Sequence, residues 1–262
     1  MLRFASLGSG SRGNALLAEA REGASATRVL IDCGMKLRDT ERRLARLGLE
    51  PGEVDAILVT HEHSDHAGCV FDFAAAHGAA VYIAHGCLAA LRDEGKVLEG
   101  VKIREVRAGE AFGIGAALVT PFTVPHDARE PVQYLISDGA VRLGVLTDIG
   151  ASTLHVEQML SGLDALVLET NYDADMLWNG AYPKWLKSRI AGPFGHLDNR
   201  EAERLLAAVD RSRLKHVVAA HLSQQNNTPA LARAALARAM GCEESWIEVA
   251  SQDEGFGWRE IL

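Results

Sequence analysis

The sequence has few features that would anchor it in a membrane or cross-link it. It contains no run of 18 apolar residues, which excludes a transmembrane helix. Its first residues lead directly into an expected strand and lack the layout of a signal peptide. The four cysteines show no Cys-x-x-Cys spacing, so we interpret them as reduced, mostly buried thiols of a cytoplasmic protein. Cys33 and Cys69 lie near the polar motif described below, and a ligand role for them stays open.

Positive charge is also scarce. The formal net charge is −8, which disfavours a nucleic-acid partner. The deficit is uneven, because residues 184–215 hold eight Lys or Arg residues against four Asp or Glu residues. This stretch is either a set of ordinary solvated helix faces or a local cationic surface.

Signals of a nucleotide site or of several domains are missing as well. The glycine-rich stretch from Gly8 to Asn14 is not a Gly-x-Gly-x-x-Gly opening a helix, so we expect no nucleotide cofactor. No linker, low-complexity tract or convincing repeat interrupts the chain, and 48% hydrophobic residues can fill a core. We therefore expect one domain over residues 1–262.

Short strands and helices are expected along the whole length. Strands are predicted at 2–7, from 15, at 29–32, 56–60, 132–136, 141–146 and 165–169, with further strands within 97–124 that turn at Gly109 and Gly113. Helices are predicted at 41–47, 67–77, 152–160 with Ser152 as the cap, 199–209 and 229–240. Asp138-Gly139 is typical of a hairpin turn. Two β-rich halves with interspersed helices predict an α/β fold, a four-layer αββα sandwich.

The most informative stretch is Thr60-His-Glu-His-Ser-Asp-His66. It places His61, His63, Asp65 and His66 within six positions, directly after an apolar strand. Neutral imidazoles and a carboxylate suit zinc, manganese or iron. Such a turn can aim all four side chains at one point. A polar turn with surface histidines is the alternative, and this spacing disfavours it.

The motif resembles that of the metallo-β-lactamase fold, a superfamily of αββα metallohydrolases. The resemblance implies a later His, an Asp and a final His at strand ends. His126, Asp148 and His221 follow apolar runs in that order. It also implies that Asp32, after an earlier strand, lies beneath the metals and braces the first motif.

The ligand assignment comes from this resemblance. One divalent ion, zinc or manganese, is expected on His61, His63 and His126. A second is expected on Asp65, His66 and His221, with Asp148 bridging both. A hydroxide between the ions would be the nucleophile, and Asp65 would orient it.

Three further segments resemble the YycJ/WalJ branch of this superfamily: Gly8 to Asn14, Leu168 to Asp173, and Gly180 to Asn199. The chain departs from the branch at Tyr172, where we expect His, and at Asp198, where we expect Ser. The resemblance implies a cytoplasmic bacterial phosphodiesterase acting on DNA, a 5′→3′ exonuclease linked to DNA repair. Only 72 residues separate Asp148 from His221, which leaves no room for a β-CASP insertion.

Several residues outside the ligand set are candidates for catalysis or substrate binding. His196 matches a non-ligand histidine of related nucleases and would protonate the leaving 3′-oxygen; capping the next helix or binding a phosphate are the alternatives. Ser11, Asn14, Asn171 and Asn226 are weaker candidates, which would contact either the substrate or the metal ligands; turn formation is the competing explanation for each. Lys184, Lys187 and Arg189 are expected on or near a helix that caps the site, where they could contact a DNA backbone.

Two other functions remain open at this point. The fold also serves small-molecule hydrolases, such as a cyclic phosphodiesterase, a thioesterase or a β-lactamase-like enzyme. A metal-binding regulatory protein without catalysis is the second, and the complete ligand set disfavours it. The sequence leaves metal identity, strand preference and oligomeric state undecided.

Overall fold

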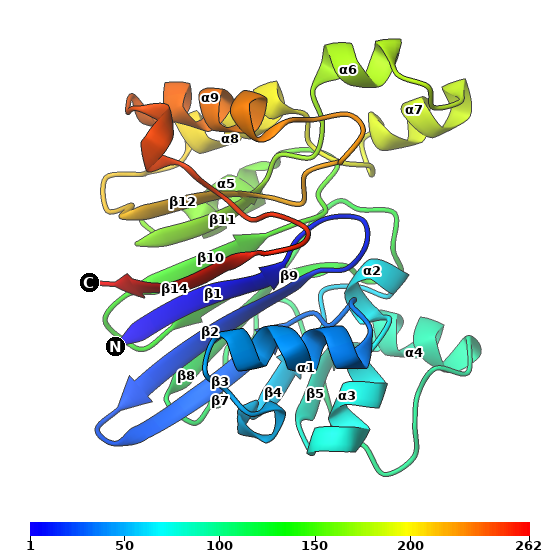
Figure 1. Cartoon of the computed structure of the whole chain (residues 1–262), viewed down its shortest axis with the longest axis vertical. Helices are drawn as coiled ribbons and strands as arrows, with labels where there is room; N and C mark the ends of the chain where they lie inside the picture. Colours follow the sequence, from blue (N-terminus) through cyan, green and yellow to red (C-terminus); the bar gives the residue numbers. More distant parts are fainter.

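The computed structural model describes residues 1–262 as two seven-stranded sheets with helices on their outer faces (Figure 1). The first sheet has the order β14 (Phe256–Ile261), β1 (Leu2–Gly8), β2 (Ala15–Glu22), β3 (Ser25–Ile31), β4 (Ala56–Leu58), β5 (Ala80–Ala84) and β6 (Ile103–Val106). The second has the order β13 (Glu248–Val249), β12 (His216–Ala220), β11 (Ala165–Glu169), β10 (Arg142–Leu146), β9 (Val132–Ser137), β8 (Ala117–Thr123) and β7 (Phe112–Ile114). The predicted αββα sandwich is confirmed.

Helices form the two outer layers. Along the first sheet lie α1 (Leu37–Arg46), α2 (Ser64–Ala67), α3 (Val70–His77) and α4 (His85–Asp93). Along the second lie α5 (Leu154–Leu160), α8 (Asn199–Ala208) and α9 (Pro229–Met240). Two short helices, α6 (Ala174–Asn179) and α7 (Lys184–Ile190), project at the upper right of Figure 1. Single 3₁₀ turns occur at Pro51–Glu53 and Glu244–Trp246. No helix is both long enough and apolar enough to cross a bilayer.

Each sheet is parallel on one side and antiparallel on the other. Strands β3 to β6 run parallel in the first sheet, and β10 to β13 run parallel in the second. The carboxyl ends of parallel neighbours meet at one edge of a sheet. The loops that follow β3, β4, β10, β11 and β12 therefore converge, and they carry the motifs identified in the sequence.

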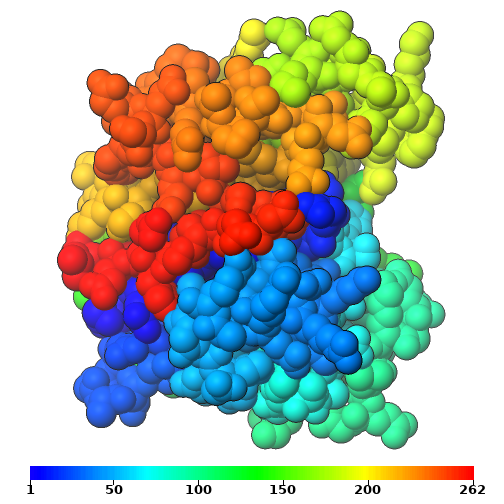
Figure 2. Space-filling model, viewed as in Figure 1, coloured from blue at the N-terminus to red at the C-terminus, as the bar shows by residue number.

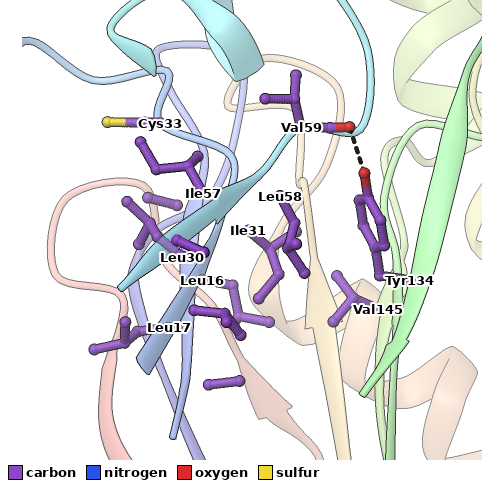
Figure 3. Close-up of a cluster of buried hydrophobic side chains, with 14 of the residues drawn as sticks. Leu16, Leu17, Leu30, Ile31, Cys33, Ile57, Leu58, Val59, Tyr134 and Val145 are labelled. Atoms are coloured by element: carbon purple, nitrogen blue, oxygen red, sulfur yellow. Dashed lines mark hydrogen bonds between the residues drawn. The ribbon is translucent and has the colours of Figure 1, made fainter. Parts of the chain in front are cut away.

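Alternation along the strands separates two apolar layers. In β9, Tyr134 faces the interior between the sheets, whereas Leu135 faces the layer beneath α5 and α8. Tyr134 is fully buried, and its hydroxyl donates to the carbonyl of Val59 at 2.7 Å, which ties the second sheet to the chain after β4 (Figure 3). The buried phenol is thus satisfied, and the link fixes the start of the metal motif.

The structure corrects three local predictions. Residues 67–77 are not one helix, because α2 begins at Ser64 and a break at Gly68-Cys69 precedes α3. The cap of α5 is Thr153, not Ser152, because the Thr153 side chain accepts from the amide of Val156. The turn expected at Gly113 lies at Gly115, whose φ of 50° suits glycine.

Candidate metal centre

The structure brings the seven predicted ligand residues together at the strand ends. His61 and His63 lie in the loop after β4, and Asp65 and His66 lie in the first turn of α2. Four groups of side chains have ligand atoms within 4.8 Å of one another: His61–His63–His126, His61–His66–Asp148, Asp65–His66–His221 and Asp148–Glu169–His196–His221. His66, Asp148 and His221 each belong to two of these groups, so the donors form one continuous cluster. Glu169 and His196, which were not predicted as ligands, lie at one side of it.

Three residues of this cluster have left-handed backbone. Asp32 has a φ of 61°, Asp148 of 56° and His221 of 54°, and they are the only non-glycine residues with positive φ. Asp32 and His221 follow directly on β3 and β12, and Asp148 lies two residues after the last residue of β10. This conformation costs an ordinary residue roughly 1–2 kcal/mol. The sharp reversal of the chain turns these side chains inward toward a shared point. Strained backbone of this kind is common at functional sites.

Asp32 braces the first motif from below. Its Oδ1 accepts from the amide of Thr60, and its Oδ2 accepts from the Thr60 hydroxyl, both at 2.8 Å. Nδ1 of His66 donates to Asp32 Oδ2 at 2.7 Å. In neutral His66 this bond holds the proton on Nδ1, so Nε2 can bind a metal.

Close backbone packing holds the same turn. Gly34 follows Asp32 and Cys33, and a Cβ at Gly34 would collide with the carbonyl of Asp65. The amide of Cys33 donates to the carbonyl of His66 at 2.8 Å, and the amide of Asn14 donates to the carbonyl of Asp65 at 2.8 Å. A side chain at residue 34 would push the ligand turn away.

The donor atoms fit a cation, because several face one another and two lack any hydrogen-bond partner. His126 donates through Nδ1 to the carbonyl of Gly195 at 3.0 Å, so its Nε2 is bare, 3.4 Å from Nδ1 of His63. Nε2 of His61 and Oδ2 of Asp148 are buried with no hydrogen-bond partner. Nε2 of His66 lies 2.9 Å from the same Asp148 oxygen. Unpaired acceptors at such distances are stable only around a positive charge.

The pKa directions report the same crowding of charge. Burial lowers the pKa of His61 well below its ordinary value, and neighbouring imidazoles lower it further. Burial opposes protonation of His66 and His221 too, but nearby carboxylates outweigh it: the pKa of His66 is raised well above its usual range and that of His221 to about 10. Surrounding histidines hold the pKa of Asp148 well below its usual range despite burial. The carboxylates of the cluster are therefore ionised, and positive charge, either on the histidines or on a bound metal ion, stabilises them.

Glu169, at the end of β11, is a functional residue that the sequence reasoning did not assign. Its Oε1 accepts from Nδ1 of His196 at 2.7 Å and lies 3.3 Å from Nδ1 of His221. Its Oε2 accepts from the amides of Ile149 and Leu197. Glu169 is fully buried. Its position after a buried strand, as with Asp148, was the available signal.

Comparisons with known proteins agree with this geometry. A family model described as the beta-lactamase superfamily domain matches residues 27–222. The chain belongs to the metallo-β-lactamase superfamily.

Full-length relatives narrow this further. The chain is 32% identical over 262 residues to the exodeoxyribonuclease YycJ of Bacillus anthracis, which covers all of this chain and 93% of that protein. It is 30% identical over 233 residues to the exodeoxyribonuclease WalJ of Streptococcus pneumoniae, covering 88% of this chain and 85% of the relative. The predicted membership of the YycJ/WalJ branch is thus confirmed, and the chain is a metal-dependent hydrolase.

Solved structures show the fold alone. Zinc-bound PqqB from Methylobacterium extorquens has a TM-score of 0.74 with 18% identity, covering 99% of this chain and 100% of that one. YhfI from Bacillus subtilis has a TM-score of 0.72 with 16% identity, covering 99% and 100%. The two-sheet metallo-β-lactamase core therefore extends over the whole chain.

A cleft of about 290 Å³ opens over the predicted metal ligands of this chain. Its lining residues are Ser11, His63, Asp65, Asp127, Asp148, Tyr182, Leu186, Arg189, Ile190, Gly195, His196 and His221. His63 and Asp65 have partly exposed side chains, whereas those of Asp148 and His221 are buried. Asp127 and His196 also have partly exposed side chains in this cleft, so these four residues are open to a ligand there.

The three asparagines predicted to contact either the substrate or the ligands are buried, and two of them, Asn14 and Asn171, contact the predicted ligands. The Asn14 side chain accepts from the Gly10 amide at 2.8 Å and lies 3.0 Å from Nε2 of His66. Asn171 donates to the carbonyl of His221 at 2.8 Å. Asn226 is buried near Gly180, and its amide donates to the Ser223 hydroxyl. Ser11 is exposed and lines the cleft.

The two departures from the branch have structural roles. Tyr172 and Asp198 form an isolated parallel bridge, and the amide of Asn199 donates to the carbonyl of Tyr172. Asp198 is the N-cap of α8, accepting from the Glu201 amide at 2.7 Å. Serine and aspartate serve equally well at this position. His196 therefore does not cap the helix.

The cationic candidates lie on α7, as expected, but in different surroundings. Lys184 is exposed, and Arg189 pairs through Nε with Asp127 Oδ2 at 2.7 Å. Lys187 is buried, and its ammonium donates to the carbonyls of Trp178 and Gly180 at 2.8 and 2.7 Å. Its charge is therefore turned toward the loop and away from the substrate side.

The thiols do not join the ligand groups. Sγ of Cys33 lies 3.7 Å from the Thr40 hydroxyl, on the side of α1, and neither Cys33 nor Cys69 belongs to a cluster of ligand atoms. Burial and the neighbouring Cys69 raise the pKa of the Cys33 thiol well above its usual range. A neutral buried thiol packs as a small apolar group.

Proposed function

We propose that this protein is a binuclear metal-dependent phosphodiesterase that degrades DNA from its ends. The observation that carries the proposal is the convergence of the seven predicted ligands beneath a cleft that is also lined by His196. We assign His196 to the substrate and not to a metal, because its Nδ1 already donates to Glu169. Relatives that match almost the whole chain are exodeoxyribonucleases. We take the 5′→3′ direction and the link to DNA repair from the same branch.

Two divalent ions, zinc or manganese, fit the donor set. His61, His63 and His126 would hold the first, Asp65, His66 and His221 the second, and Asp148 would contact both. When bound, such ions lower the pKa of water from about 16 toward about 7 and neutralise phosphate charge. Asp32 and Glu169 orient the histidines from behind.

Asp65 and His196 are the side chains that would orient the attacking water and protonate the leaving 3′-oxygen. Asp65 lines the cleft, and its carboxylate accepts a hydrogen bond from the attacking water. His196 holds its Nδ1 proton toward Glu169, so its Nε2 is the atom that can carry a proton to the leaving 3′-oxygen. Glu169 raises the pKa of His196 against the opposing effect of burial, which favours the acid form.

The test is digestion of linear duplex and single-stranded DNA, labelled at either the 5′ or the 3′ end, with added zinc or manganese. We expect metal-dependent release of mononucleotides, with the 5′ label released first. Release of the 3′ label first would reverse the polarity. No cleavage of any DNA with either metal would contradict the function.

A small-molecule hydrolase is the second candidate, favoured by the net charge of −8. Salt separates the two, since binding to a DNA backbone weakens steeply with ionic strength. We expect kcat/KM on DNA to fall strongly between 50 and 200 mM salt, while hydrolysis of a small ester stays nearly constant. All four cysteines are free thiols, which is consistent with the proposed cytoplasmic location, where thiols stay reduced.

A further inference from the structure

Large aromatic side chains are exposed on the projecting segment from Ala174 to Phe194, here called the arm. Trp178 is 53% exposed, Trp185 67% and Phe194 57%. Figure 2 shows the arm, in yellow-green, overhanging the right-hand edge of the molecule. Clustered exposed rings on one segment mark an interaction surface.

The arm is held firmly in place. Lys187 of α7 donates to the carbonyls of Trp178 and Gly180, which joins α6 to α7. A Cβ at Gly195 would collide with the carbonyls of Arg189 and Ile190, so the chain folds tightly back after α7. The rings are therefore presented by a rigid support.

Asp127 connects α7 and the backbone of Phe194 to the candidate metal centre. Its carboxylate accepts from Arg189, and its amide donates to the carbonyl of Phe194 at 3.0 Å. Asp127 Oδ1 lies 3.5 Å from Nε2 of His126. Trp185 and Arg189 are four residues apart in α7 and so share one face. Trp185 therefore lies on the helix face that also carries Arg189, and Arg189 contacts Asp127 beside the predicted ligand His126.

We propose that Trp185 and Phe194 stack on unpaired nucleobases of the strand that enters the cleft. This rests on the proposed DNA function. The neighbouring groups favour nucleic acid over a second copy of the chain or a lipid surface: Arg189 and Lys184 can meet phosphates, and the same helix lines the reaction cleft. Alternating rings and cations form the surface that binds single strands.

Stacking of this kind has a consequence for substrate choice. A base inside a duplex presents its faces to neighbouring bases, so only an unpaired base can stack on a protein ring. Every base has an aromatic face, so the surface accepts any sequence. The enzyme should therefore prefer single-stranded or frayed ends, with little dependence on sequence.

The test compares substitutions at residue 185 that keep or remove the ring. In metal-loaded enzyme, Trp185→Leu retains apolar volume without an aromatic face, and Trp185→Phe retains the face. We expect Trp185→Leu to lower kcat/KM on single-stranded oligonucleotides about ten-fold or more, and Trp185→Phe to recover most of it. Hydrolysis of bis(p-nitrophenyl) phosphate should stay unchanged in both. Trp246→Leu is the control, because Trp246 is 40% exposed beside β13 in a separate pocket.

Oligonucleotides with abasic positions locate the contact. If Trp185 stacks on a base, removing that base should slow the wild type, and the loss should not add to that of Trp185→Leu. Phe194→Leu should behave likewise at a different position. Equal rates for wild type and both leucine variants on DNA would overturn the inference while the nuclease function stands. The inference would also be overturned if the wild type were a dimer, Trp185→Leu were a monomer, and the variant lost activity equally on DNA and on bis(p-nitrophenyl) phosphate. The ring would then contact a second copy of the chain. A wild type that cleaves no nucleic acid would instead refute the proposed function itself.

Discussion

Glu169 and His196 are joined by a 2.7 Å hydrogen bond between Oε1 and Nδ1, across 27 residues of sequence. The carboxylate is fully buried, and the imidazole is about one-fifth exposed at the cleft. The pair therefore holds one ring nitrogen in the interior and leaves the other for the substrate. This arrangement is suited to delivering a proton at a fixed place.

His196→Ala should slow cleavage of DNA about 10²–10⁴-fold, because the departing 3′-alkoxide is strongly basic and needs a proton. Hydrolysis of bis(p-nitrophenyl) phosphate should change little, since p-nitrophenolate is already a stable anion. Steady-state kinetics on both substrates, with metal content measured in parallel, checks this. An equal loss on both would assign His196 to phosphate binding, and lost metal would make it a ligand.

Metal-loaded protein should contain two ions per chain. The bare nitrogens of His61 and His126 and the unpartnered Asp148 oxygen motivate this number. Removing the ions with a chelator should lower the melting temperature, because ligands that bind only the folded state stabilise it. Elemental analysis and thermal melts test both. A content of one ion or fewer after reconstitution would refute the binuclear arrangement.

Asp148→Asn should cost far more activity than Asp32→Asn. Asp148 belongs to ligand groups on both sides of the cluster, whereas Asp32 acts through Thr60 and His66. Loss of such a supporting group typically costs ~10–100-fold. The check is kcat/KM together with metal affinity for each variant. Equal activities, or the reverse order, would show that Asp148 does not bridge.

Lys187→Met should loosen the arm without unfolding the protein. The substitution keeps the apolar stem but leaves the carbonyls of Trp178 and Gly180 without their donor. We expect faster amide exchange in residues 174–190 and lower activity on DNA, with a nearly unchanged melting temperature. Lys184→Met on the same helix is the matched control, because Lys184 is exposed. Similar amide exchange in both variants would show that the hydrogen bonds of Lys187 to Trp178 and Gly180 do not hold the arm in place.

Glu19 should make stability depend on acid pH. Burial raises its pKa, but Arg3, Arg21 and Arg28 outweigh burial and lower it from 4.5 to about 2. A depressed pKa means that the carboxylate stabilises the fold above about pH 4.5 and that this contribution fades as pH falls toward 2. Urea unfolding of wild type and Glu19→Gln should differ most at pH 7, and the gap should narrow from pH 4.5 to pH 3. A constant gap would mean that the arginines do not stabilise the charge.

The sequence predicted the sandwich because apolar runs mark strands, and it offered the His61–His66 motif because its spacing is local. The grouping of that motif with His126, Asp148 and His221 came from the resemblance to the metallo-β-lactamase superfamily, which places such residues after strands. Glu169 is the last residue of β11, and the pairing of β11 with β12 brings His221 near it. His196 comes near through the loop between α7 and α8, where the amide of Asn171 donates to the carbonyl of Leu197. Nothing local announces that contact.

Other features escaped for the same reason. Strand β14 was not predicted, and it pairs with β1 from the opposite end of the chain, joining Leu2 to Ile261. The exposed position of Trp185 and the buried one of Lys187 also depend on how α6 and α7 fold back. A seven-residue helix does not show from its sequence which face is covered.

The left-handed backbone at Asp32, Asp148 and His221 bears on how relatives of this protein would drift. Glycine adopts such angles without steric cost, so the backbone alone favours glycine at Asp148 and His221. Asp32 differs, because it accepts hydrogen bonds from Thr60 and His66 that glycine cannot accept. A gene copy released from hydrolysis should therefore lose Asp148 and His221 before it loses Asp32. Glycine at residues 148 and 221 beside a retained aspartate at residue 32 would mark a protein that has kept the scaffold and given up the chemistry.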